Sequence, residues 1–409
     1  MASSKHRRLR RRLLTTMIII LTVGTYAGLC LLLPVKALSP PQSNSFLKIT
    51  TPTSNLPWPK YGEGAVGLGN GTVIQSHGQQ AQLPIASVAK LITALTVLKK
   101  YPLVPGQNGP MITIDSTDYG FYSKYIAEQG SVVPVYVGEQ LSELQMLEAM
   151  LVPSGNNIAD SLARWAYGSV SGYDQFANNY IKQLGLVNTT VAGDASGYLP
   201  TTISNSDDLI KLGGYVMANP VLTQIVNLKS VNIPNVGLMQ NYNNILGTAG
   251  IVGIKTGNSN QAGGVFLGAA NTTVSNKTVM VLVALMGAPT LGQVLNDTVP
   301  VIISVENDFA QTILVNKGEI LGEFKQPWGG IVQVAAKNNL IVYLLQGQTA
   351  KAKLHLGALT VPAVSGSVIG SLNSLPDQIN SSVSDQVVIV QSTTKPSWQW
   401  RLLHPEYIL

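Results

Sequence analysis

The chain has 409 residues, and its 26 Lys and Arg outnumber its 20 Asp and Glu, which makes the formal net charge +6. Six of those cations stand together before residue 13, so the rest of the chain is formally neutral. This distribution excludes a nucleic-acid-binding domain, which needs cations spread over a face or groove. A content of 45% hydrophobic and 11% charged residues excludes an intrinsically disordered chain, and the length predicts two domains plus appendages.

The N-terminal cations precede a segment that predicts a membrane-spanning helix. An uncharged, mostly apolar run extends from Leu13 to Leu33 and ends at Pro34. About 20 such residues span a bilayer as a helix, and Lys and Arg stay on the cytoplasmic side. We therefore expect a cytoplasmic basic tip over residues 1–12, a single transmembrane or signal-anchor helix over 13–34, and the remaining chain on the extracytoplasmic side of the cell membrane. The six cations are Lys5, Arg7, Arg8, Arg10, Arg11 and Arg12.

A cleaved signal peptide is the alternative to a retained anchor. Val35-Lys36-Ala37 offers small residues at a suitable spacing for cleavage after Ala37. The apolar core of a secretory signal has about 7–15 residues, so the length of this run favours the retained anchor. The protein is exported under either interpretation.

The sequence offers neither a cross-link nor a metal site. Its single cysteine, Cys30, lies inside the apolar run, so no intramolecular disulfide is possible. The four histidines are scattered and show no metal-ligand spacing. We expect no metal and no cofactor.

After the apolar run the pattern predicts a linker and then an α+β domain. Residues 35–59 are rich in Pro, Ser and Thr, which is typical of an extended linker. Asn70-Gly71 between two short apolar runs predicts a β-hairpin. Helical patterns follow, and strand-like runs return later, so both ends of the segment contribute to one sheet of a domain over residues 60–312. The helical patterns cover 87–100, 140–151 and 157–168, and the later strand-like runs cover 250–255, 264–270 and 278–286.

Beyond a helix-like stretch near 299–312, alternating patterns predict a second domain over residues 313–409. This domain is expected to be an all-β sandwich of about 100 residues. The alternating runs cover 330–336, 340–346, 352–356 and 387–390.

The first motif that carries chemistry is Ser87-Val88-Ala89-Lys90 at the start of an amphipathic helix. Residues i and i+3 share a helix face, so the Lys90 amine can reach the Ser87 hydroxyl. A serine needs a neighbouring base to act as a nucleophile, and lysine can serve when its pKa is lowered. The same Ser-x-x-Lys spacing also occurs at Ser45 and at Ser392, but neither copy leads an apolar helix.

Two further motifs complete an ordered set. Ser154-Gly155-Asn156 lies in an expected loop between helices and offers a second hydroxyl and an amide. Lys255-Thr256-Gly257 ends a strand-like run and offers a cation and a hydroxyl for a substrate carboxylate, while its glycine lets a ligand backbone approach the sheet edge. Ser-x-x-Lys, Ser-x-Asn and Lys-Thr-Gly in this order form the triple of β-lactamases and penicillin-binding proteins.

With these motifs the chain resembles the serine-type D-alanyl-D-alanine carboxypeptidases, the low-molecular-mass penicillin-binding proteins. The likeness covers roughly residues 60–290 and includes the surroundings of each motif, Pro84–Leu95, Met150–Asn156 and Gly253–Gly257. It implies a β-lactamase/transpeptidase-like domain, with an antiparallel sheet, helices on both faces and a helical cluster. The β-rich tail, with Trp398-Gln399-Trp400-Arg401-Leu402-Leu403 near its end, is similar to the family's C-terminal β domain.

The resemblance also implies a role for each matched residue. Ser87 would be the acylated nucleophile and Lys90 its base, while Ser154 and Asn156 would relay protons and position the substrate. The backbone amides of Ser87 and Asn258 would form the oxyanion hole. Lys255, Thr256 and Gly257 would bind substrate, with the first two holding the terminal carboxylate. The implied reaction removes D-Ala from peptidoglycan stem peptides through an acyl-enzyme, and β-lactam antibiotics would acylate the same serine.

Three positions depart from the family pattern. Asn157 stands where the family commonly has Asp after the second motif, and Val252 stands where an Asp often precedes the third. Tyr242 precedes Asn243-Asn244-Ile245-Leu246 where some members place an Arg that supports the substrate carboxylate. Because the principal groups are present, these departures bear on substrate preference and rate rather than on the reaction class.

Three alternatives to a carboxypeptidase remain at this stage. Class A β-lactamases deacylate with a Glu between the second and third motifs, and no Glu lies between Gly155 and Ile254. An endopeptidase that cuts peptidoglycan cross-links would use the same residues. A catalytically inactive, membrane-anchored wall-binding protein is a reading of a different class, which the intact triple disfavours.

The C-terminus does not predict a membrane helix of its own. Relatives often hold the membrane through an amphipathic C-terminal helix, whereas His404–Leu409 is short and interrupted by a proline. We therefore expect the N-terminal helix to attach the protein to the membrane, with the β domain setting the height of the active site.

Overall fold

The computed structural model of the chain describes residues 2–41, 46–52, 55–274, 277–375 and 382–408. These residues form two compact units. The larger unit comprises Thr51–Ala310 with Leu345–Gln348, and the smaller unit comprises the two chain ends, Met1–Thr50 and Thr349–Leu409, with Gln311–Leu344.

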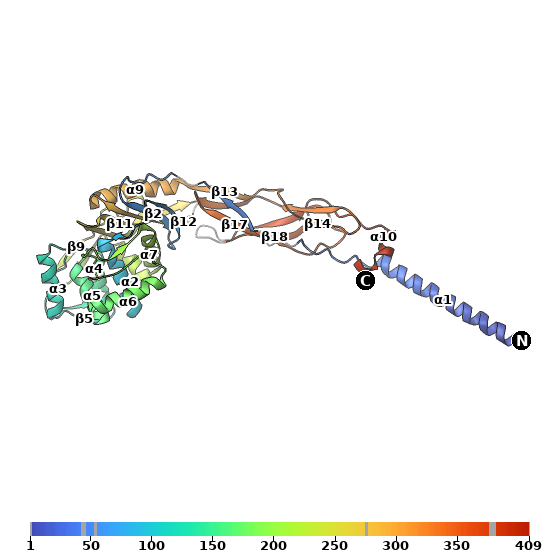
Figure 1. Ribbon diagram of the computed structural model, residues 1–409, viewed down its shortest axis with the longest axis horizontal. Helices are drawn as coiled ribbons and strands as arrows, with labels where there is room; N and C mark the ends of the chain where they lie inside the picture. Colours follow the sequence, from blue (N-terminus) through green and yellow to red (C-terminus); the bar gives the residue numbers. More distant parts are fainter. Residues whose placement is uncertain (1, 42–45, 53–54, 275–276, 376–381, 409) are drawn as a thin grey trace. The chain divides into compact units, whose positions relative to one another are not determined.

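The larger unit is built on a five-stranded antiparallel sheet with the strand order β10-β11-β12-β2-β3 (Figure 1). Strands from both ends of the unit thus lie side by side, and the hairpin around Asn70-Gly71 forms as predicted. The strands are β2 (Glu63–Leu68), β3 (Val73–His77), β10 (Ile251–Ser259), β11 (Gly263–Val274) and β12 (Lys277–Ala288).

Helices cover both faces of this sheet. Along β12, Val283 and Leu285 belong to the hydrophobic cluster that contains residues of α9 (Leu291–Asn307), while Leu282 and Ala284 belong to the cluster that contains residues of α7 (Ser206–Ala218). Since successive side chains of a strand point to opposite faces, α9 and α7 lie on opposite sides of the sheet. A strand covered on both faces has no solvent side, which explains why β12 is apolar almost without interruption.

A cluster of helices packs beyond α7, with α2 at its centre. Lys90 to Leu98 of α2 are all buried, and α2 contacts α4, α5, α6 and α7. The helices of the larger unit are α2 (Lys90–Lys100), α3 (Ser116–Ala127), α4 (Glu143–Leu151), α5 (Asn156–Tyr167), α6 (Val170–Gln183), α7 (Ser206–Ala218), α8 (Pro220–Val226) and α9 (Leu291–Asn307), with short 3₁₀ turns η1 (Ala86–Ala89) and η2 (Thr248–Gly250). Short strand pairs join β4 (Leu83–Pro84) to β7 (Ile203–Ser204), β5 (Met111–Thr113) to β6 (Gln140–Ser142) and β8 (Ser230–Ile233) to β9 (Gly237–Gln240).

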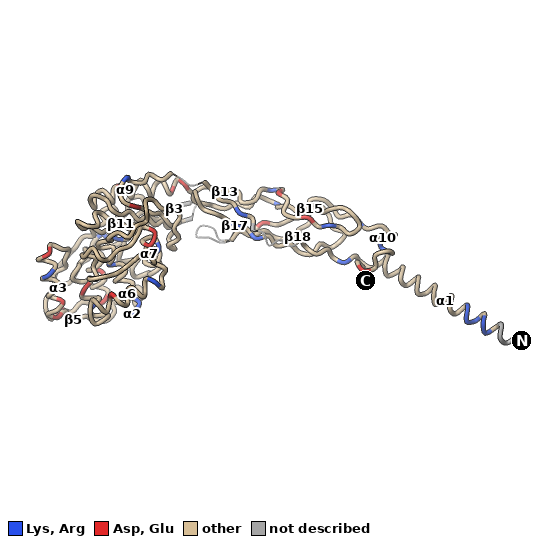
Figure 2. The backbone as a smooth tube through the Cα atoms, viewed as in Figure 1, with Lys and Arg blue, Asp and Glu red and all other residues tan. Residues whose placement is uncertain are grey.

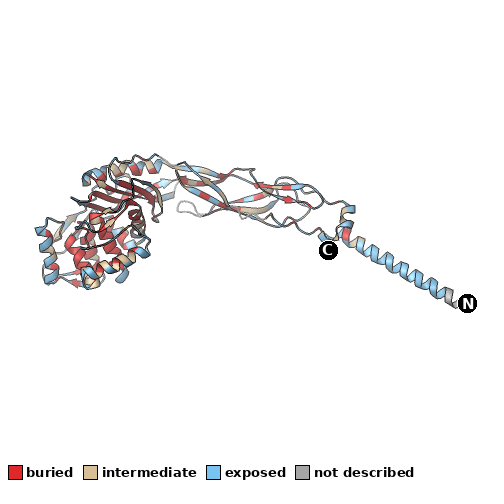
Figure 3. Ribbon diagram, viewed as in Figure 1, coloured by how far each residue is buried: buried red, intermediate tan, exposed pale blue. Residues whose placement is uncertain are grey.

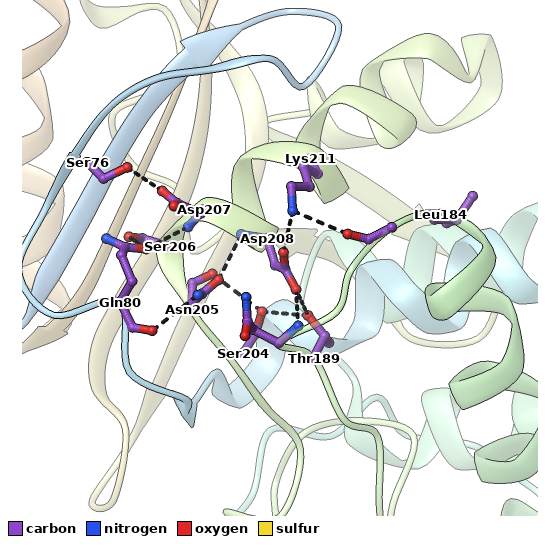
Figure 4. Close-up of polar contacts among 12 residues, drawn as sticks. Ser76, Gln80, Leu184, Thr189, Ser204, Asn205, Ser206, Asp207, Asp208 and Lys211 are labelled. Carbon is purple, nitrogen blue, oxygen red and sulfur yellow. Dashed lines mark hydrogen bonds and ion pairs between the residues drawn. The ribbon is translucent and has the colours of Figure 1, made fainter.

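A polar network ties the start of α7 to the segments around it (Figure 4). The Asn205 side chain caps the helix by accepting a hydrogen bond from the backbone N–H of Asp208. The buried Asp208 carboxylate pairs with Lys211 at 2.8 Å and accepts a hydrogen bond from Thr189 at 3.1 Å. The network anchors the chain on both sides of residues 190–203, which form the loop that reaches the site described below.

The smaller unit contains two sheets around one core. Six strands pair in the order β1-β17-β18-β19-β15-β14, and β13 pairs with β16. Phe324 and Val332 from the first sheet share a hydrophobic cluster with Val342 and Leu344 from the second, as in a sandwich. The strands are β1 (Phe46–Thr50), β13 (Phe309–Val315), β14 (Ile320–Lys325), β15 (Ile331–Ala336), β16 (Leu340–Leu345), β17 (Thr349–Leu356), β18 (Val368–Ser374) and β19 (Ser384–Ile389).

The expected fold class is confirmed: an α+β unit with helices on both faces of an antiparallel sheet, and a second, all-β unit. Three details of the prediction are wrong. The linker expected over 35–59 contributes β1, which pairs with β17 in the smaller unit. The helix expected near 299–312 starts earlier, at Leu291, and ends at Asn307. The residues Trp398–Leu403, which we grouped with a β-rich tail, form the short helix α10.

The N-terminal segment is a single helix, α1 (Ala2–Leu32), and it is long and apolar enough to cross a membrane. Basic residues occupy its first turns (Figure 2), and its side chains from His6 onward are mostly exposed (Figure 3). An exposed face rich in Leu and Ile along most of a helix is unfavourable in water and favourable in lipid.

Candidate active site

The predicted nucleophile lies in η1, the 3₁₀ turn that leads directly into α2. Residues i and i+3 eclipse one another in a 3₁₀ turn, so Ser87 and Lys90 lie on one side. The Lys90 Nζ donates a hydrogen bond to the Ser87 Oγ at 2.7 Å. A neutral amine at this distance can instead accept the serine proton, which is the first requirement for a nucleophile–base pair.

Two further acceptors hold the Lys90 amine in place. The Asn156 Oδ1 accepts from it at 2.7 Å and the backbone carbonyl of Ser196 at 3.1 Å. Lys90 is completely buried, so all of its hydrogen bonds come from the protein. The amine is therefore fixed by groups from three separate segments.

The second motif places its two functional side chains on either side of a helix start. Asn156 is the first residue of α5, and Ser154 precedes it in the left-handed region with φ of 62°. A non-glycine residue in this region is uncommon and turns its side chain away from the path of the helix. Ser154 is thereby separated from α5 and lies at the wall of a cleft that Ser87 also lines.

The third motif lies on the edge strand β10, which contacts η1. A Cβ at Gly257 would lie 2.7 Å from the Ile85 carbonyl, so only glycine lets the strand approach the turn before Ser87 this closely. A Cβ at Gly197 would lie 2.0 Å from the Ala86 carbonyl in the same turn. Two glycines thus allow β10 and the 190–203 loop to approach the turn that carries Ser87.

These elements enclose a cleft of about 520 Å³. Five of the residues predicted for the site line the cleft, namely Ser87, Ser154, Asn156, Thr256 and Asn258. The other three, Lys90, Lys255 and Gly257, lie behind its wall and are largely shielded from solvent. The structure therefore brings together all eight predicted residues, although they come from three motifs that are far apart in the sequence. Lys90 of the first motif and Asn156 of the second, for example, are 66 positions apart.

The two buried lysines have lowered pKa values. Burial disfavours the charged form of Lys90, the charge of Lys255 acts in the same direction, and the pKa of Lys90 falls well below its usual value, although Asp194 and Asp160 oppose the shift. Burial lowers the pKa of Lys255 to about 7. The environment therefore favours a neutral Lys90, the form in which an amine can act as a base.

Two buried aspartates under the site were not predicted from the sequence. Asp160 accepts hydrogen bonds from the Tyr125 hydroxyl at 2.7 Å and the Ala195 backbone N–H at 2.9 Å, and burial raises its pKa to about 6. Asp194 accepts from the backbone and hydroxyl of Ser196 at 2.7 and 2.6 Å. Both carboxyls therefore hold the loop whose carbonyl contacts Lys90.

Only one of these aspartates carried a signal in the sequence. Asp160 follows Asn156 by four positions and so lies on the same face of a predicted helix. Asp194 and Ser196 reach the site from a loop more than 100 positions after Lys90, and no local pattern indicates that contact.

Asn157, the first departure from the family pattern, has a structural role. Its Oδ1 accepts from the Val133 N–H at 3.0 Å, and its Nδ2 donates to the Val133 carbonyl at 2.9 Å. An Asp in the charged form could make only the first of these bonds. Asn157 thus fastens the segment beside Ser131, which lines the cleft, to α5.

Within the described part of the chain, no group of three or more His, Cys, Asp or Glu side chains could hold a metal ion. The chemistry available in the cleft is that of a serine hydroxyl, a buried amine, a second serine, and amide and backbone donors. This set suits acyl transfer through a covalent intermediate.

Comparison with known proteins identifies a family for the larger unit. The family model described as D-alanyl-D-alanine carboxypeptidase matches residues 65–290. The chain is 26% identical over 214 residues to the D-alanyl-D-alanine carboxypeptidase DacA of Haemophilus influenzae, an alignment that covers 52% of each protein. It is 32% identical over 165 residues to a D-alanyl-D-alanine endopeptidase of the same organism, covering 39% of this chain and 51% of the relative. The chain thus spans about half the length of these two curated relatives.

Solved structures show a similar fold over more of the chain. The structure of penicillin binding protein 5 from Haemophilus influenzae superposes with a TM-score of 0.58 at 22% sequence identity. That superposition covers 83% of this chain and 99% of the other. The likeness therefore extends beyond the residues that the family model matches.

Proposed function

Because the chain belongs to the D-alanyl-D-alanine carboxypeptidase family, we propose that it is a serine-type D-Ala-D-Ala carboxypeptidase that trims peptidoglycan stem pentapeptides. The observation that carries the proposal is the 2.7 Å hydrogen bond between the Ser87 hydroxyl and the buried Lys90 amine. A serine hydroxyl paired with an amine whose pKa is lowered is the arrangement required for covalent catalysis.

In the acylation step the Ser87 Oγ attacks the carbonyl carbon of the D-Ala-D-Ala bond while neutral Lys90 takes the serine proton. The backbone N–H groups of Ser87 and Asn258 stabilise the oxyanion, and such preorganised donors contribute about 3 kcal/mol each. Ser154 passes its proton to the leaving amine and regains one from protonated Lys90 as the peptide bond breaks and D-Ala departs, which leaves Lys90 neutral again.

Substrate recognition and deacylation complete the cycle. Lys255 and Thr256 bind the terminal carboxylate, and Gly257 lets the peptide lie along the edge of β10, where an added strand finds unpaired backbone groups. Water then attacks the acyl-enzyme, the bond to the Ser87 Oγ breaks, and the shortened stem peptide leaves as Ser87 regains its proton. A β-lactam follows the same first step and acylates Ser87.

The test of this function is the release of D-Ala from defined substrates. Purified full-length protein is incubated with uncross-linked pentapeptide muropeptides and, separately, with cross-linked dimers, and the products are separated by mass. We expect free D-Ala and tetrapeptide from the first substrate. Intact substrates in both incubations, together with no covalent adduct from labelled penicillin, would instead support the inactive wall-binding alternative.

An endopeptidase is the second candidate, and Tyr242 favours it. This residue is half-exposed and lines the cleft where some family members place an arginine for the substrate carboxylate, and the described lining residues include no arginine. A cross-linked substrate whose acceptor amine belongs to a lysine side chain has no carboxylate beside the scissile amide, so its binding depends less on that cation. Relatives named as endopeptidases also match this chain. Monomers released from cross-linked dimers faster than D-Ala from pentapeptides would identify this activity.

The two buried lysines predict the pH dependence of the reaction. Activity requires neutral Lys90, so kcat/KM rises as the pH increases through the lowered pKa of this amine. Carboxylate binding requires charged Lys255, whose pKa is about 7 in the free protein, so kcat/KM falls as the pH increases beyond that value. The expected profile of kcat/KM for D-Ala release is therefore bell-shaped.

The variant Lys255→Arg separates the two limbs of this profile. A guanidinium stays charged throughout the accessible pH range, so the alkaline limb should move to higher pH while the acidic limb stays in place. An alkaline limb that is identical in wild type and Lys255→Arg would show that Lys255 does not supply the titrating cation.

We further propose that the N-terminal helix is retained and holds the enzyme to the cell membrane, with the basic tip inside and the larger unit outside. Backbone pairing on both sides of Ala37 supports retention. The Lys36 N–H donates to the Tyr407 carbonyl at 2.7 Å, and Leu38 exchanges two 2.9 Å hydrogen bonds with Leu359. Val35 and Leu38 are both buried.

Retention of the helix predicts the mass of the mature protein. Protein extracted from membranes with detergent should have an intact mass that includes residues 2–37. A mature chain that begins at Leu38 and is recovered without detergent would contradict the anchor and support the cleaved signal peptide.

A further inference from the structure

The outer end of α1 has a backbone carbonyl that its own helix cannot satisfy. The Cys30 carbonyl would normally accept from the N–H four residues later, but that residue is Pro34, which has no N–H. The Arg401 Nε of α10 donates to this carbonyl at 2.7 Å, and its guanidinium also donates to the Leu33 carbonyl. A cation at these carbonyls is favoured by the helix dipole as well.

More contacts join the same face of α1 to the end of the chain. The Tyr26 hydroxyl, one turn before Cys30, donates to the Leu402 carbonyl at 2.6 Å. After the helix, the Lys36 Nζ donates to the Glu406 carbonyl at 3.0 Å. Cys30 is fully buried here, whereas the other large apolar side chains of α1 are exposed. The C-terminal segment is therefore hydrogen-bonded to the end of α1 through Arg401, Leu402 and Glu406, and we call this set of contacts the clasp.

Aromatic side chains hold α10 on the smaller unit. Trp400 stacks on His404 with ring centroids 4.5 Å apart and meets the edge of Trp328 at 5.4 Å. Trp328 in turn donates its indole N–H to the Thr394 carbonyl at 3.0 Å. The position of α10 is thus set both by α1 and by the unit that carries it.

The clasp places α10 at a definite depth if α1 spans the bilayer. From Leu13, the run of about 20 residues covers roughly 30 Å of hydrocarbon at 1.5 Å per residue, so Leu33 lies at the outer boundary. α10 is hydrogen-bonded to residues 26, 30 and 33 and therefore lies at that boundary too. Yet two large apolar side chains of this small helix point outward, with Trp398 63% and Leu403 76% exposed.

We propose that α10 is seated in the headgroup region of the outer leaflet, with Trp398 and Leu403 inserted among the lipids. The inference rests on the proposed membrane anchoring. Tryptophan is enriched at this depth because its indole combines an apolar body with a polar N–H, and arginine reaches polar groups at the boundary while its stem stays apolar. The smaller unit is then held at the membrane by both of its chain ends rather than by a flexible tether.

The test measures whether lipid reaches Trp398 in the full-length protein. The protein is reconstituted in phosphatidylcholine vesicles, either plain or brominated near the top of the acyl chains, where bromine quenches nearby tryptophan fluorescence. The chain has five tryptophans, so the contribution of Trp398 to the quenching is the difference between wild type and the variant Trp398→Phe. We expect wild-type fluorescence to be quenched by the brominated lipid and Trp398→Phe to lose most of that quenching. An equal quenched fraction in both proteins would overturn the proposal, and would leave a protein partner as the occupant of this face.

A second variant tests the clasp itself. Arg401→Gln removes the guanidinium from the carbonyls of α1, so the quenching of Trp398 should fall at least twofold, whereas the matched control Lys395→Gln, an exposed cation before α10, should behave as wild type. Unchanged quenching in Arg401→Gln would show that Arg401 does not set the position of α10.

A high-pH wash of the same vesicles separates this inference from the anchoring on which it rests. Protein that washes free would overturn both. Protein that stays bound while Trp398→Phe has no effect would overturn only the seating of α10. Penicillin labelling in each sample reports the active site and should be the same in all of these variants.

Discussion

Ser87→Ala is expected to abolish D-Ala release and penicillin labelling. The substitution removes the hydroxyl that is hydrogen-bonded to the Lys90 amine, so no acyl-enzyme can form. Loss of the nucleophile lowers kcat in a serine hydrolase on the order of 10⁶-fold. The rate enhancement that remains over the uncatalysed reaction comes from substrate binding and the oxyanion hole. The measurement is covalent labelling with a fluorescent penicillin, followed by the rate of D-Ala release from a pentapeptide.

The chain supplies its own control for this experiment. Ser392 begins another Ser-x-x-Lys sequence, but it is exposed and lies between β19 and α10, outside any helix. Ser392→Ala should therefore label and react as wild type. Thermal unfolding should give the same Tm for Ser87→Ala and wild type within a few degrees, because Ser87 is only partly buried. A penicillin adduct that persists in Ser87→Ala would refute the assignment of the nucleophile.

Lys90→Met is expected to reduce the acylation rate about 10²–10⁴-fold, the usual contribution of a general base. Methionine fills a similar volume but cannot take the Ser87 proton. The Asn156 Oδ1 and the Ser196 carbonyl also lose a buried donor, and each such loss costs about 1–3 kcal/mol of stability. Single-turnover labelling with penicillin gives the acylation rate, and thermal unfolding gives the stability.

Lys99 on the same helix provides the matched control. It is exposed, and its Nζ lies 6.0 Å from the Tyr180 ring centroid, outside the cleft. Lys99→Met should keep the wild-type acylation rate. If Lys90→Met acylates as fast as Lys99→Met at every pH, another group must serve as the base, and the proposed role of Lys90 is wrong.

The sequence predicted the helices and strands whose signals are local. The apolar stripe from Val88 to Leu98 and the turn at Asn70-Gly71 both depend on neighbouring residues, and both elements form as expected. Strand β1 was missed because its partner, β17, lies about 300 residues later in the chain. No turn next to β1 indicates a hairpin, so its short sequence does not reveal the strand with which it pairs. Helix α10 was missed because its contacts with α1 are equally remote.

The candidate site divides in the same way. Spacing alone places the Ser87 hydroxyl beside the Lys90 amine, because a helical turn brings residues i and i+3 together. Tertiary structure alone brings the Ser196 carbonyl to that amine and places Asp160 and Asp194 beneath the loop that carries it. The requirement for glycine at positions 197 and 257 could not be predicted from the sequence either. It arises only because two distant segments approach the turn that carries Ser87 in the folded protein.

By itself the sequence determined the reaction class expected of this chain, since that depends on which groups are present and on short spacings. It also determined the apolar helix, since the length and composition of one continuous segment suffice. Only the tertiary structure decided how far the environment shifts the two lysines, because burial and the distance between charges depend on packing. It also decided that the end of α1 meets the C-terminal segment, because the Cys30 carbonyl, which Pro34 leaves without a donor, accepts a hydrogen bond from Arg401.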